Sequence, residues 1–457
     1  MDKNLLKKQI SDNIVWLIEK GLIEEAEQCL RQFQQFFPDD AEYYSMEAGL
    51  FLAKGNANEA ITSIQKGLLK NPWHTDLLQN QLFISSVITQ DSTEAVRAHA
   101  MLQLLGRGEQ ALFPADFKLP KPGFRVLQGT MEIANQMNTL TAALNKQGIS
   151  AQAVNYHKSY LGYNSGQDVS FEDCRTEEEL IIKSKMFAAE ALSEYDIFHF
   201  HFGTSLTWDH SDLPLLKSLE KKAVMHYWGS DVRRLSVARQ HNPYVRVKNN
   251  NESQIVKEIE NISAHISDCI VADQELYLYV KDLFPRVHFL PQAIDLVKYE
   301  IKEQFSKRRP LLVHAPTSPE IKGTKHILKA IDILHQEYEF DFQLIQGLSH
   351  EQAQITYQQA DLIIDQILVG SYGLLAVEAM AMGKPVVCWI SEFMRNKYPA
   401  GLPIIVANPD TITDVLRYWL KNQDMLAERG RQGRKYTEIH HDADIVVEKL
   451  VAIYQKL

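Results

Sequence analysis

From about residue 124 onward, short apolar runs alternate with helical stretches, and this alternation occurs twice in succession. The first series contains FRVLQG, AQAVNY, DIFHFHFG, KAVMHYWG, HISDCIVAD and VHFLPQ. After the charged stretch IKEQFSKRRP, a second series contains LLVHAP, FQLIQG, DLIIDQ, KPVVCWI and LPIIVAN, and the segment 411–457 reads as helices. Buried strands that alternate with helices predict doubly wound parallel sheets. The sequence therefore predicts two α/β domains in tandem, with ligands bound in a cleft where the strands of both sheets end.

The first hundred residues contain an internal repeat with a period of 34 residues. The recurring pairs are Lys20/Lys54, Gly21/Gly55, Glu25/Glu59, Ala26/Ala60, Leu30/Ile64 and Pro38/Pro72. A glycine between two helices, an alanine where they cross and a proline after the second resemble the tetratricopeptide (TPR) repeat. A third, degraded unit around Thr93, Glu94 and Ala95 is offset by one residue and is expected to cap the array. The alternative is an ordinary helical bundle with a chance periodicity.

Between the repeat and the first predicted strand, the sequence RGEQALFPADFKLPKPG has three prolines, two glycines and no period, which indicates a linker. The predicted domains are therefore 1–106 (all-α, TPR-like), 107–123 (linker), 124–305 (first Rossmann-like domain) and 306–457 (second Rossmann-like domain with C-terminal helices).

Composition excludes several classes of protein. With 45% hydrophobic residues the chain has enough apolar material for several cores, and its formal net charge of -10 argues against a general nucleic-acid binder. Its four cysteines lie far apart and form no C-x-x-C pair, which favours reduced thiols in a cytoplasmic protein. The N-terminus lacks the features of a signal peptide, and no apolar run approaches the ~18 residues of a membrane span.

The strongest local signal is GSYGLLAVEAMAMGKPVV, residues 370–387. Two glycines at a strand end permit a tight turn, and the helix that follows offers free N–H groups and a dipole that favour a diphosphate. Glu378 lies in the second turn of that helix, where an ionised carboxylate can accept two hydrogen bonds from ribose hydroxyls. The alternative is a simple turn followed by a solvated glutamate.

Two further strand ends carry polar side chains. His199 and His201 alternate with phenylalanines in DIFHFHFG, so both imidazoles lie on one face of the strand. A zinc site is one alternative, but no further ligand follows at a suitable spacing, and a structural role in the core is another for His199. The next strand leads into MHYWGSDVRR, which supplies His226, Asp231 and Arg233; a pairing of the last two within the turn is possible.

From about residue 124 to the C-terminus, the sequence resembles the GT-B glycosyltransferases, most closely the large retaining group called family 4 (glycosyl transferases group 1). The family pattern E-G-F-G-L-x-x-x-E-A-M-A-x-G-x-P-V-V is matched at Gly373, Leu374, Glu378, Ala379, Met380, Ala381, Gly383, Pro385, Val386 and Val387. The resemblance implies transfer of a sugar from a nucleotide donor with retention of configuration. It also implies that the second domain holds the nucleotide and the first holds the acceptor.

The resemblance has two departures. Gly370 stands eight positions before Glu378, where the family has the first glutamate of its pair, which contacts the donor sugar; the nearby Asp365 is a weak candidate to replace it. Lys322-Gly323 matches the family's Lys-Gly after the first strand of the nucleotide domain, but the arginine that usually precedes it is missing. Lys322 is a suitable point charge for the phosphates. The residues expected to bind the nucleotide sugar are Lys322, Gly323, Gly370, Ser371, Tyr372, Gly373, Leu374 and Glu378.

In the first domain, the resemblance assigns His201 to a position near the donor sugar and Asp231 or Arg233 to the sugar or the acceptor. We expect the catalytic residues to be His201, Asp231 and Glu378. The expected acceptor-binding residues are Gly129, Glu132 and Arg233, with Asn135 nearby, and Asp295 lies where the chain is expected to cross between domains.

The sequence thus predicts a cytoplasmic retaining glycosyltransferase of hexosyltransferase type, active in glycan biosynthesis. Its donor would be a UDP- or GDP-linked sugar, and its acceptor a glycan, a lipid-linked or a protein hydroxyl, with a possible protein partner on the TPR-like surface. No metal and no other cofactor are predicted, because the Asp442-Ala443-Asp444 pattern lies in a helical segment and not at a strand end. The alternatives are a non-catalytic scaffold and a sugar-nucleotide epimerase.

Overall fold

The computed structural model describes residues 3–157, 167–169, 171, 173–301 and 309–457. The chain forms two compact units, each described here by itself. The first comprises residues 1–125, 171–196 and 205–221, and the second comprises 126–170, 197–204 and 222–457. The predicted four-part division of the chain stays a prediction.

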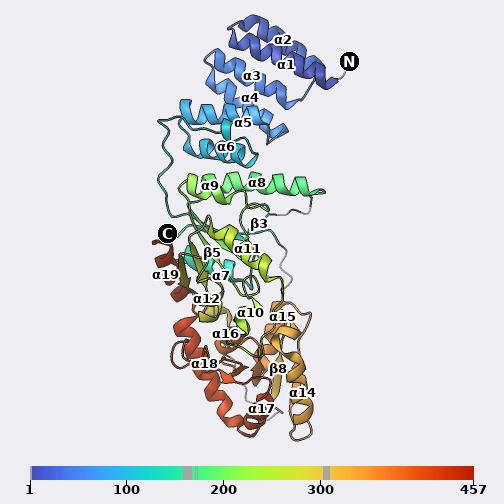
Figure 1. The fold of residues 1–457 in the computed structure, drawn as a ribbon, viewed down its shortest axis with the longest axis vertical. Helices are drawn as coiled ribbons and strands as arrows, with labels where there is room; N and C mark the ends of the chain where they lie inside the picture. The colour runs from blue at the N-terminus through green and yellow to red at the C-terminus, as the bar shows by residue number, and fades with distance from the viewer. Residues whose placement is uncertain (1–2, 158–166, 170, 172, 302–308) are drawn as a thin grey trace. The chain divides into compact units, whose positions relative to one another are not determined.

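The described part of the first unit is helical (Figure 1). Its helices are α1 (Lys3–Glu19), α2 (Ile23–Phe36), α3 (Ala41–Ala53), α4 (Ala57–Lys70), α5 (Thr75–Phe83), the π-helix η1 (Ile84–Ile88), α6 (Ser92–Leu104), η2 (Gly108–Gln110), α8 (Glu177–Glu194) and α9 (Leu213–Ser218). Helices α3 and α4 pack together, as do α5 and α6, and α8 lies against α6. A helix from the glycosyltransferase-like part of the sequence therefore extends the N-terminal helical stack.

The 34-residue repeat corresponds to two equivalent helix pairs. Gly21 and Gly55 end α1 and α3 with φ of 72° and 78°, the left-handed conformation in which glycine meets no Cβ penalty. The same two backbone hydrogen bonds close each turn, in the first case from Leu22 to Leu17 and from Gly21 to Ile18. The repeated alanines, Ala26 and Ala60, are fully buried. The repeat is a structural one, and its assignment to the TPR class stays a prediction.

The third unit is offset by one residue, and a π-helical turn accounts for the offset. Helix α5 continues into η1, and a π-helical turn accommodates more residues than an α-helical one. Gln90, 35 residues after Gly55, then takes the left-handed position with φ of 55°. Glu94 and Ala95 follow as the counterparts of Glu59 and Ala60.

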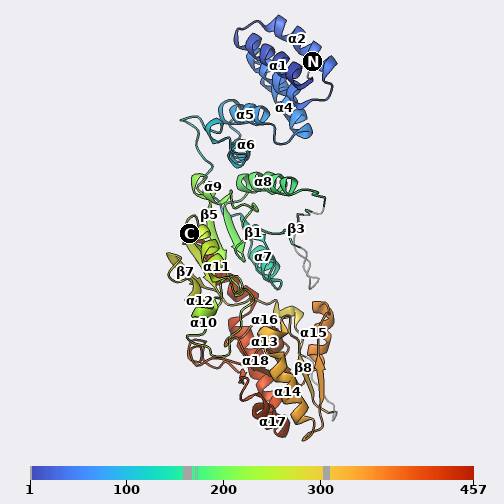
Figure 2. The same ribbon diagram turned by 45° about the vertical axis from the view of Figure 1, so that its right-hand side comes forward.

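The second unit contains a seven-stranded sheet of order β3-β2-β1-β4-β5-β6-β7, in which all pairs are parallel. Figure 2 labels β1, β3, β5 and β7 of this sheet. Its strands are β1 (Val126–Thr130), β2 (Ala151–Asn155), β3 (Gln167–Asp168), β4 (Ile197–His201), β5 (Lys222–His226), β6 (Asp268–Val271) and β7 (Arg286–Phe289). Val126 on β1 pairs with Ala151 on one side and Ile197 on the other. The strand order therefore reverses around β1, which is the point where such sheets bind ligands.

A second parallel sheet, of five strands, has the order β12-β11-β10-β8-β9. Its strands are β8 (Leu311–His314), β9 (Asp341–Leu344), β10 (Leu362–Ile364), β11 (Val386–Cys388) and β12 (Ile405–Val406). Alternate residues face opposite cores: Leu312 packs with α14 and α17, and Val313 packs with α15, α16 and α18. The strand order of this sheet reverses between β8 and β10, so the loops after these two strands meet at one edge of the sheet.

The remaining helices of the second unit connect the strands. They are α7 (Gln136–Lys146), α10 (Leu235–Ala238), α11 (Glu252–Ser263), α12 (Gln274–Val280), η3 (Leu296–Lys298), α13 (Pro319–Lys322), α14 (Thr324–Leu334), α15 (His350–Gln359), α16 (Leu374–Ala381), α17 (Ile412–Lys421), η4 (Gln423–Met425), α18 (Leu426–His440) and α19 (Ala443–Tyr454). Helix α19 follows the second sheet in the sequence but packs on α7, a helix of the first sheet domain. Ile294 and Asp442 form an isolated parallel bridge where the chain crosses twice between the sheets, next to the predicted crossing at Asp295.

The predicted fold class is confirmed: an all-helical N-terminal region precedes two parallel, doubly wound sheets. Every strand predicted from an apolar run is present, and the two-residue β3 is an addition. Among the described helices, none combines the length and the apolar character that a membrane crossing requires.

Candidate active site

The nucleotide-binding motif predicted from the sequence lies after β10 and opens helix α16. Gly370 has φ of 87°, and Gly373 is the N-cap of α16 with an extended backbone. No side chain caps this helix end, so its first N–H groups are left to a ligand or solvent. Ser371 and Tyr372 are buried; the hydroxyl of Tyr372 lies 3.1 Å from Nε2 of His441. These two side chains therefore anchor the loop in the core, and Gly373, at the start of α16, is partly exposed.

Glu378 is buried and held by two partners. Its Oε1 accepts hydrogen bonds from the Tyr299 hydroxyl at 2.9 Å and from Nε2 of His350 at 2.7 Å. Burial alone would lower the pKa of His350, but the hydrogen bond and charge of Glu378 raise it above its ordinary value. A small pocket lined by Glu378 and Leu374 shares Asn135, Tyr299 and His350 with a larger cavity of about 860 Å³. The carboxylate thus lies fixed at the edge of a ligand-sized space between the two sheet domains.

Lys322 and Asp365, which the sequence suggested separately, form an ion pair. Nζ of Lys322 lies 2.5 Å from Oδ1 of Asp365, and the Asp365 side chain is fully buried. Oδ2 of Asp365 is buried without a hydrogen-bond partner among the described residues. A Cβ on Gly323 would lie 2.6 Å from Cγ1 of Ile367, so only glycine lets the Lys322 turn dock here. Lys322 is therefore a cation held in place at the same sheet edge as Gly373.

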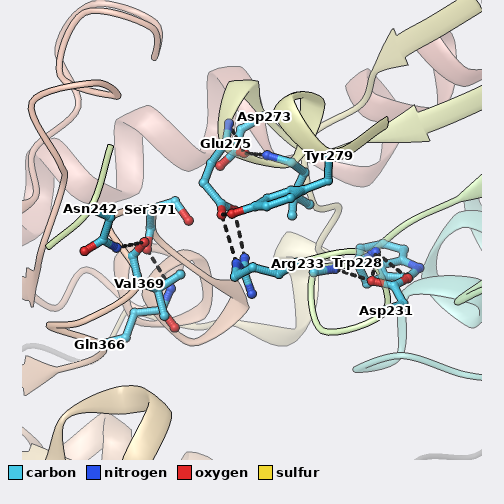
Figure 3. Close-up of polar contacts among 12 residues, drawn as sticks. Trp228, Asp231, Arg233, Asn242, Asp273, Glu275, Tyr279, Gln366, Val369 and Ser371 are labelled. Carbon is cyan, nitrogen blue, oxygen red and sulfur yellow. Dashed lines mark hydrogen bonds and ion pairs between the residues drawn. The ribbon is translucent and has the colours of Figure 1, made fainter. Parts of the chain in front are cut away.

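The structure explains the glycine at position 370. A Cβ there would lie 3.0 Å from Cβ of Ser391 and 3.2 Å from Nδ2 of Asn242, and its φ of 87° is strained for other residues. The Asn242 amide donates to the carbonyl oxygens of Leu368 and Val369, at 2.8 Å each (Figure 3). Asn242 therefore occupies the space into which a larger side chain at 370 would extend.

Asn242 belongs to a segment, 241–244, that follows α10 in the first sheet domain and docks on the second. His241 stacks on Phe393 with ring centroids 4.4 Å apart, and Tyr244 packs edge-on against Trp389. Together with the Asn242 amide, these contacts fasten the two sheet domains beside the Gly370 loop.

In the first sheet, His199, His201 and His226 form one fully buried cluster. The hydroxyl of Tyr454 lies 2.7 Å from Nδ1 of His199, whose Nε2 lies 3.2 Å from Nδ1 of His226. Burial lowers the pKa of His199 to about 3 and holds the pKa values of the other two well below 6.5. The alternation of His199 and His201 on one strand face is thus confirmed, and all three rings are neutral near neutral pH.

The ligand atoms of this cluster lie close enough to suggest a metal site, but the hydrogen bonds favour another interpretation. The indole N–H of Trp228 donates to Nδ1 of His201 at 3.2 Å, and an indole can only donate. Nε2 of His201 must then be the protonated ring nitrogen, and it donates a hydrogen bond to Oε1 of Gln128 at 3.1 Å. His201 therefore has no free lone pair for a metal, because the Trp228 indole N–H occupies that of Nδ1.

Asp231 and Arg233 have separate partners. The Asp231 carboxylate accepts from the backbone N–H of Trp228 and, at 2.6 Å, of Gly229, and burial raises its pKa to about 6. The Arg233 guanidinium points to Glu275 and forms two hydrogen bonds, of 2.9 and 2.8 Å, with its two oxygens (Figure 3). Burial alone would lower the pKa of Arg233, and the Glu275 carboxylate raises it. The alternative of a direct Asp231–Arg233 pair is not seen among the described contacts.

Of the other predicted acceptor residues, Gly129 lies within β1 and Glu132 lies just after it. A Cβ on Gly129 would lie 3.3 Å from the carbonyl oxygen of Val154, which leaves little room for a side chain. The Glu132 carboxylate accepts from the N–H groups of Met137 and Asn138 at the start of α7, and burial raises its pKa to about 7. Asn135 lies in the same turn and lines the 860 Å³ cavity. Glu132 therefore fixes the start of α7, and its predicted contact with an acceptor stays a prediction.

Sequence reasoning missed Asn242, Tyr299, His350 and Trp228. Trp228 lies inside MHYWGSDVRR, the segment already identified after β5, where an aromatic residue near a strand end was a usable signal. Tyr299 lies just after η3, four residues beyond the predicted crossing at Asp295. His350 is the first residue of α15, after the N-cap Ser349, and Asn242 lies in the loop after α10; in both cases only the folded chain brings the side chain to the site.

Comparison with known proteins agrees with this architecture. Residues 272–436 match the family model described as Glycosyl transferases group 1. A curated relative, the MMP alpha-(1->4)-mannosyltransferase of Mycolicibacterium hassiacum, is 24% identical over 200 residues, which are 37% of this chain and 48% of the relative. The chain thus matches about half the length of that relative.

Solved structures resemble the two sheet domains. Sucrose-phosphate synthase from Thermosynechococcus elongatus superposes with a TM-score of 0.53 at 13% identity, over 73% of this chain and 98% of that one. Anabaena HepE, solved in complex with UDP and glucose, gives a TM-score of 0.52 at 12% identity, over 73% of this chain and 100% of that one. The chain therefore has the GT-B fold, and its residues 272–436 match the group 1 glycosyl transferases.

Proposed function

We propose that this protein is a retaining glycosyltransferase of hexosyltransferase type that moves a sugar from a UDP- or GDP-linked donor to a hydroxyl acceptor. One observation carries this proposal. Within residues 272–436, the segment that matches group 1, the uncapped N-terminus of α16, the ammonium group of Lys322 and the fixed carboxylate of Glu378 lie at one sheet edge. The 860 Å³ cavity adjoins Glu378 through its partners Tyr299 and His350.

Each of these groups has a role in the proposed reaction. The free N–H groups of α16 and Lys322 stabilise the negative charge that develops on the departing diphosphate, so that no metal ion is required. Glu378 accepts hydrogen bonds from the ribose hydroxyls. The acceptor hydroxyl attacks from the face that the leaving group occupied, and the leaving phosphate takes its proton. His201 and Asp231 act indirectly, by fixing the conformation of the chain at the carboxyl end of the first sheet.

A thermal-shift panel tests the donor site. UDP, GDP, ADP and their common sugar conjugates are added, with and without EDTA, to the wild type, to Glu378→Ala and to Glu448→Ala, an exposed control on α19. We expect one nucleotide to raise the melting temperature independently of EDTA, in the wild type and the control but not in Glu378→Ala. If none of the nucleotides stabilises the wild type, the proposed function is wrong.

The competing proposal is a scaffold, and two observations favour it. Position 370 has neither the family glutamate nor room for it. In the first unit, a groove of about 690 Å³ is lined by α4, α5, α6 and α8 and could receive a protein partner. Nucleotide binding without donor consumption would support this second function. Consumption of the donor without any acceptor would instead indicate the epimerase. A cytoplasmic location and a role in glycan biosynthesis are part of the main proposal.

A further inference from the structure

Trp228 is a partly exposed aromatic residue at the carboxyl end of the first sheet, directly beyond β5. Three sets of contacts from different parts of the second unit hold it. They fix its backbone, the edge of its indole ring and one face of that ring.

The backbone of Trp228 is held by Asp231. The carboxylate accepts from the Trp228 N–H at 3.2 Å through Oδ1 and at 3.0 Å through Oδ2, and from Gly229 at 2.6 Å. The turn therefore closes on one buried carboxyl group, which fixes the direction in which the Trp228 side chain leaves the strand (Figure 3).

The ring edge is held by His201. The indole N–H donates to Nδ1 of His201 at 3.2 Å, and the two rings are nearly coplanar, with an interplanar angle of 14°. The other nitrogen of His201 donates to Gln128, so the imidazole has one defined tautomer. Since burial keeps His201 neutral, this acceptor is present throughout the physiological pH range.

One face of the indole is covered by His226. The ring centroids are 4.0 Å apart, with an interplanar angle of 21°. His226 is itself braced by His199, which bonds to Tyr454 of α19. Among the described residues, no aromatic ring or cation covers the opposite face. The buried histidine cluster thus supports one face of an indole ring that is itself partly exposed.

We propose that Trp228 is a stacking platform for a pyranose ring of the acceptor, an inference that rests on the proposed function. A pyranose presents a patch of C–H groups on one ring face, which an electron-rich indole face attracts, and keeps its hydroxyls free at the edges. Because the indole is already fixed, little side-chain entropy is lost when the sugar binds. Helix α16 with Glu378 belongs to the other sheet, where the donor nucleotide is proposed to bind, which leaves this platform for the second substrate.

The test compares Trp228→Leu, which keeps an apolar side chain without an aromatic face, with Trp228→Phe, which keeps a smaller one. Trp73→Leu, an exposed tryptophan of the helical region, is the matched control. The acceptor probes are methyl α-D-mannopyranoside and methyl α-D-glucopyranoside, with glycerol as a hydroxyl donor that has no ring face. Far-UV circular dichroism verifies that each variant is folded.

We expect Trp228→Leu to raise the KM for the methyl pyranosides about tenfold or more, with a smaller change in kcat and in the donor KM. Trp228→Phe should be intermediate, and Trp73→Leu unchanged. Saturation-transfer NMR of the wild type should show the ring C–H protons of the pyranoside closest to the protein, and Trp228→Leu should lose this signal.

Three outcomes would overturn the platform: an unchanged acceptor KM in Trp228→Leu, a donor KM that rises instead, or glycerol used as well as the pyranosides. The second would assign the platform to the donor. Failure of the proposed function is distinguishable, because it would appear as absent nucleotide stabilisation in the wild type, whereas pyranoside binding by NMR is measured without any donor.

Discussion

Gly370 shows how one backbone conformation limits which side chains the proposed donor site can contain. With φ of 87° and a virtual Cβ 3.0 Å from Ser391, any side chain there is strained and crowded. We expect Gly370→Ala to lower the free energy of unfolding by about 1–3 kcal/mol in urea titrations. Gly373→Ala is the control, since its φ is -111° and its nearest new contact lies at 3.7 Å; its effect should stay within about 0.5 kcal/mol. Equal losses in both variants would contradict this account.

The His350–Glu378 pair links stability to pH. The pKa of His350 is raised above 6.5 in the folded chain, so the protonated ring binds more strongly in the folded than in the unfolded state. Its stabilising contribution is complete below pH 6.5 and is lost as the pH rises through the raised pKa. Urea unfolding between pH 6 and pH 9 should therefore show a decline that is smaller in His350→Gln. His335→Gln, on the surface at the end of α14, is the control and should keep the wild-type slope.

Some of these side chains could be predicted and others could not. Lys322 and Glu378 lie in motifs whose glycines and helix starts are local, so their placement follows from neighbouring residues. Asn242 bonds to carbonyls 126 and 127 positions away, and Tyr299 bonds to a carboxylate 79 positions away. These partners meet only because the two sheet domains pack together, and nothing in the local sequence indicates which residues will meet.

Among the secondary-structure elements, the π-helix η1 leads to the clearest prediction, which concerns the stability of the turn that follows it. Gln90 takes the left-handed position that Gly21 and Gly55 take in the first two units. We expect Gln90→Gly to stabilise the helical region by up to about 1 kcal/mol, because glycine adopts this conformation without strain. Gln103→Gly, inside α6, should instead destabilise it by about 1 kcal/mol. Thermal unfolding followed by circular dichroism compares the two, and a loss of stability in Gln90→Gly would refute the equivalence of the third turn.

The strands were predicted well because each is a short apolar run between turn residues, a local signal. Strand β3 was missed because its two residues, Gln167 and Asp168, are polar and too few to form a period. It is recognisable only by its pairing with Val154 and Asn155 on β2.

Within the second unit, Asn242 connects the two sheet domains. Removing its amide in Asn242→Ala leaves the Leu368 and Val369 carbonyls without this donor, which should reduce the local opening free energy of the Gly370 loop by about 1–3 kcal/mol. Hydrogen exchange of peptides that cover residues 366–371 measures this change. Asn250→Ala, in an exposed loop, is the control and should leave exchange unchanged. Unaltered protection in Asn242→Ala would mean that the domains hold together without this contact.

The return of α19 to the first sheet has a consequence for biosynthesis. His199 is translated 255 residues before its partner Tyr454, which at ribosomal rates is an interval of roughly 10–50 s. From the synthesis of β7 until that of α19, the first sheet lacks the hydroxyl and the helix that complete its histidine cluster. Both sheets are thus synthesised before the histidine cluster of the first one is complete.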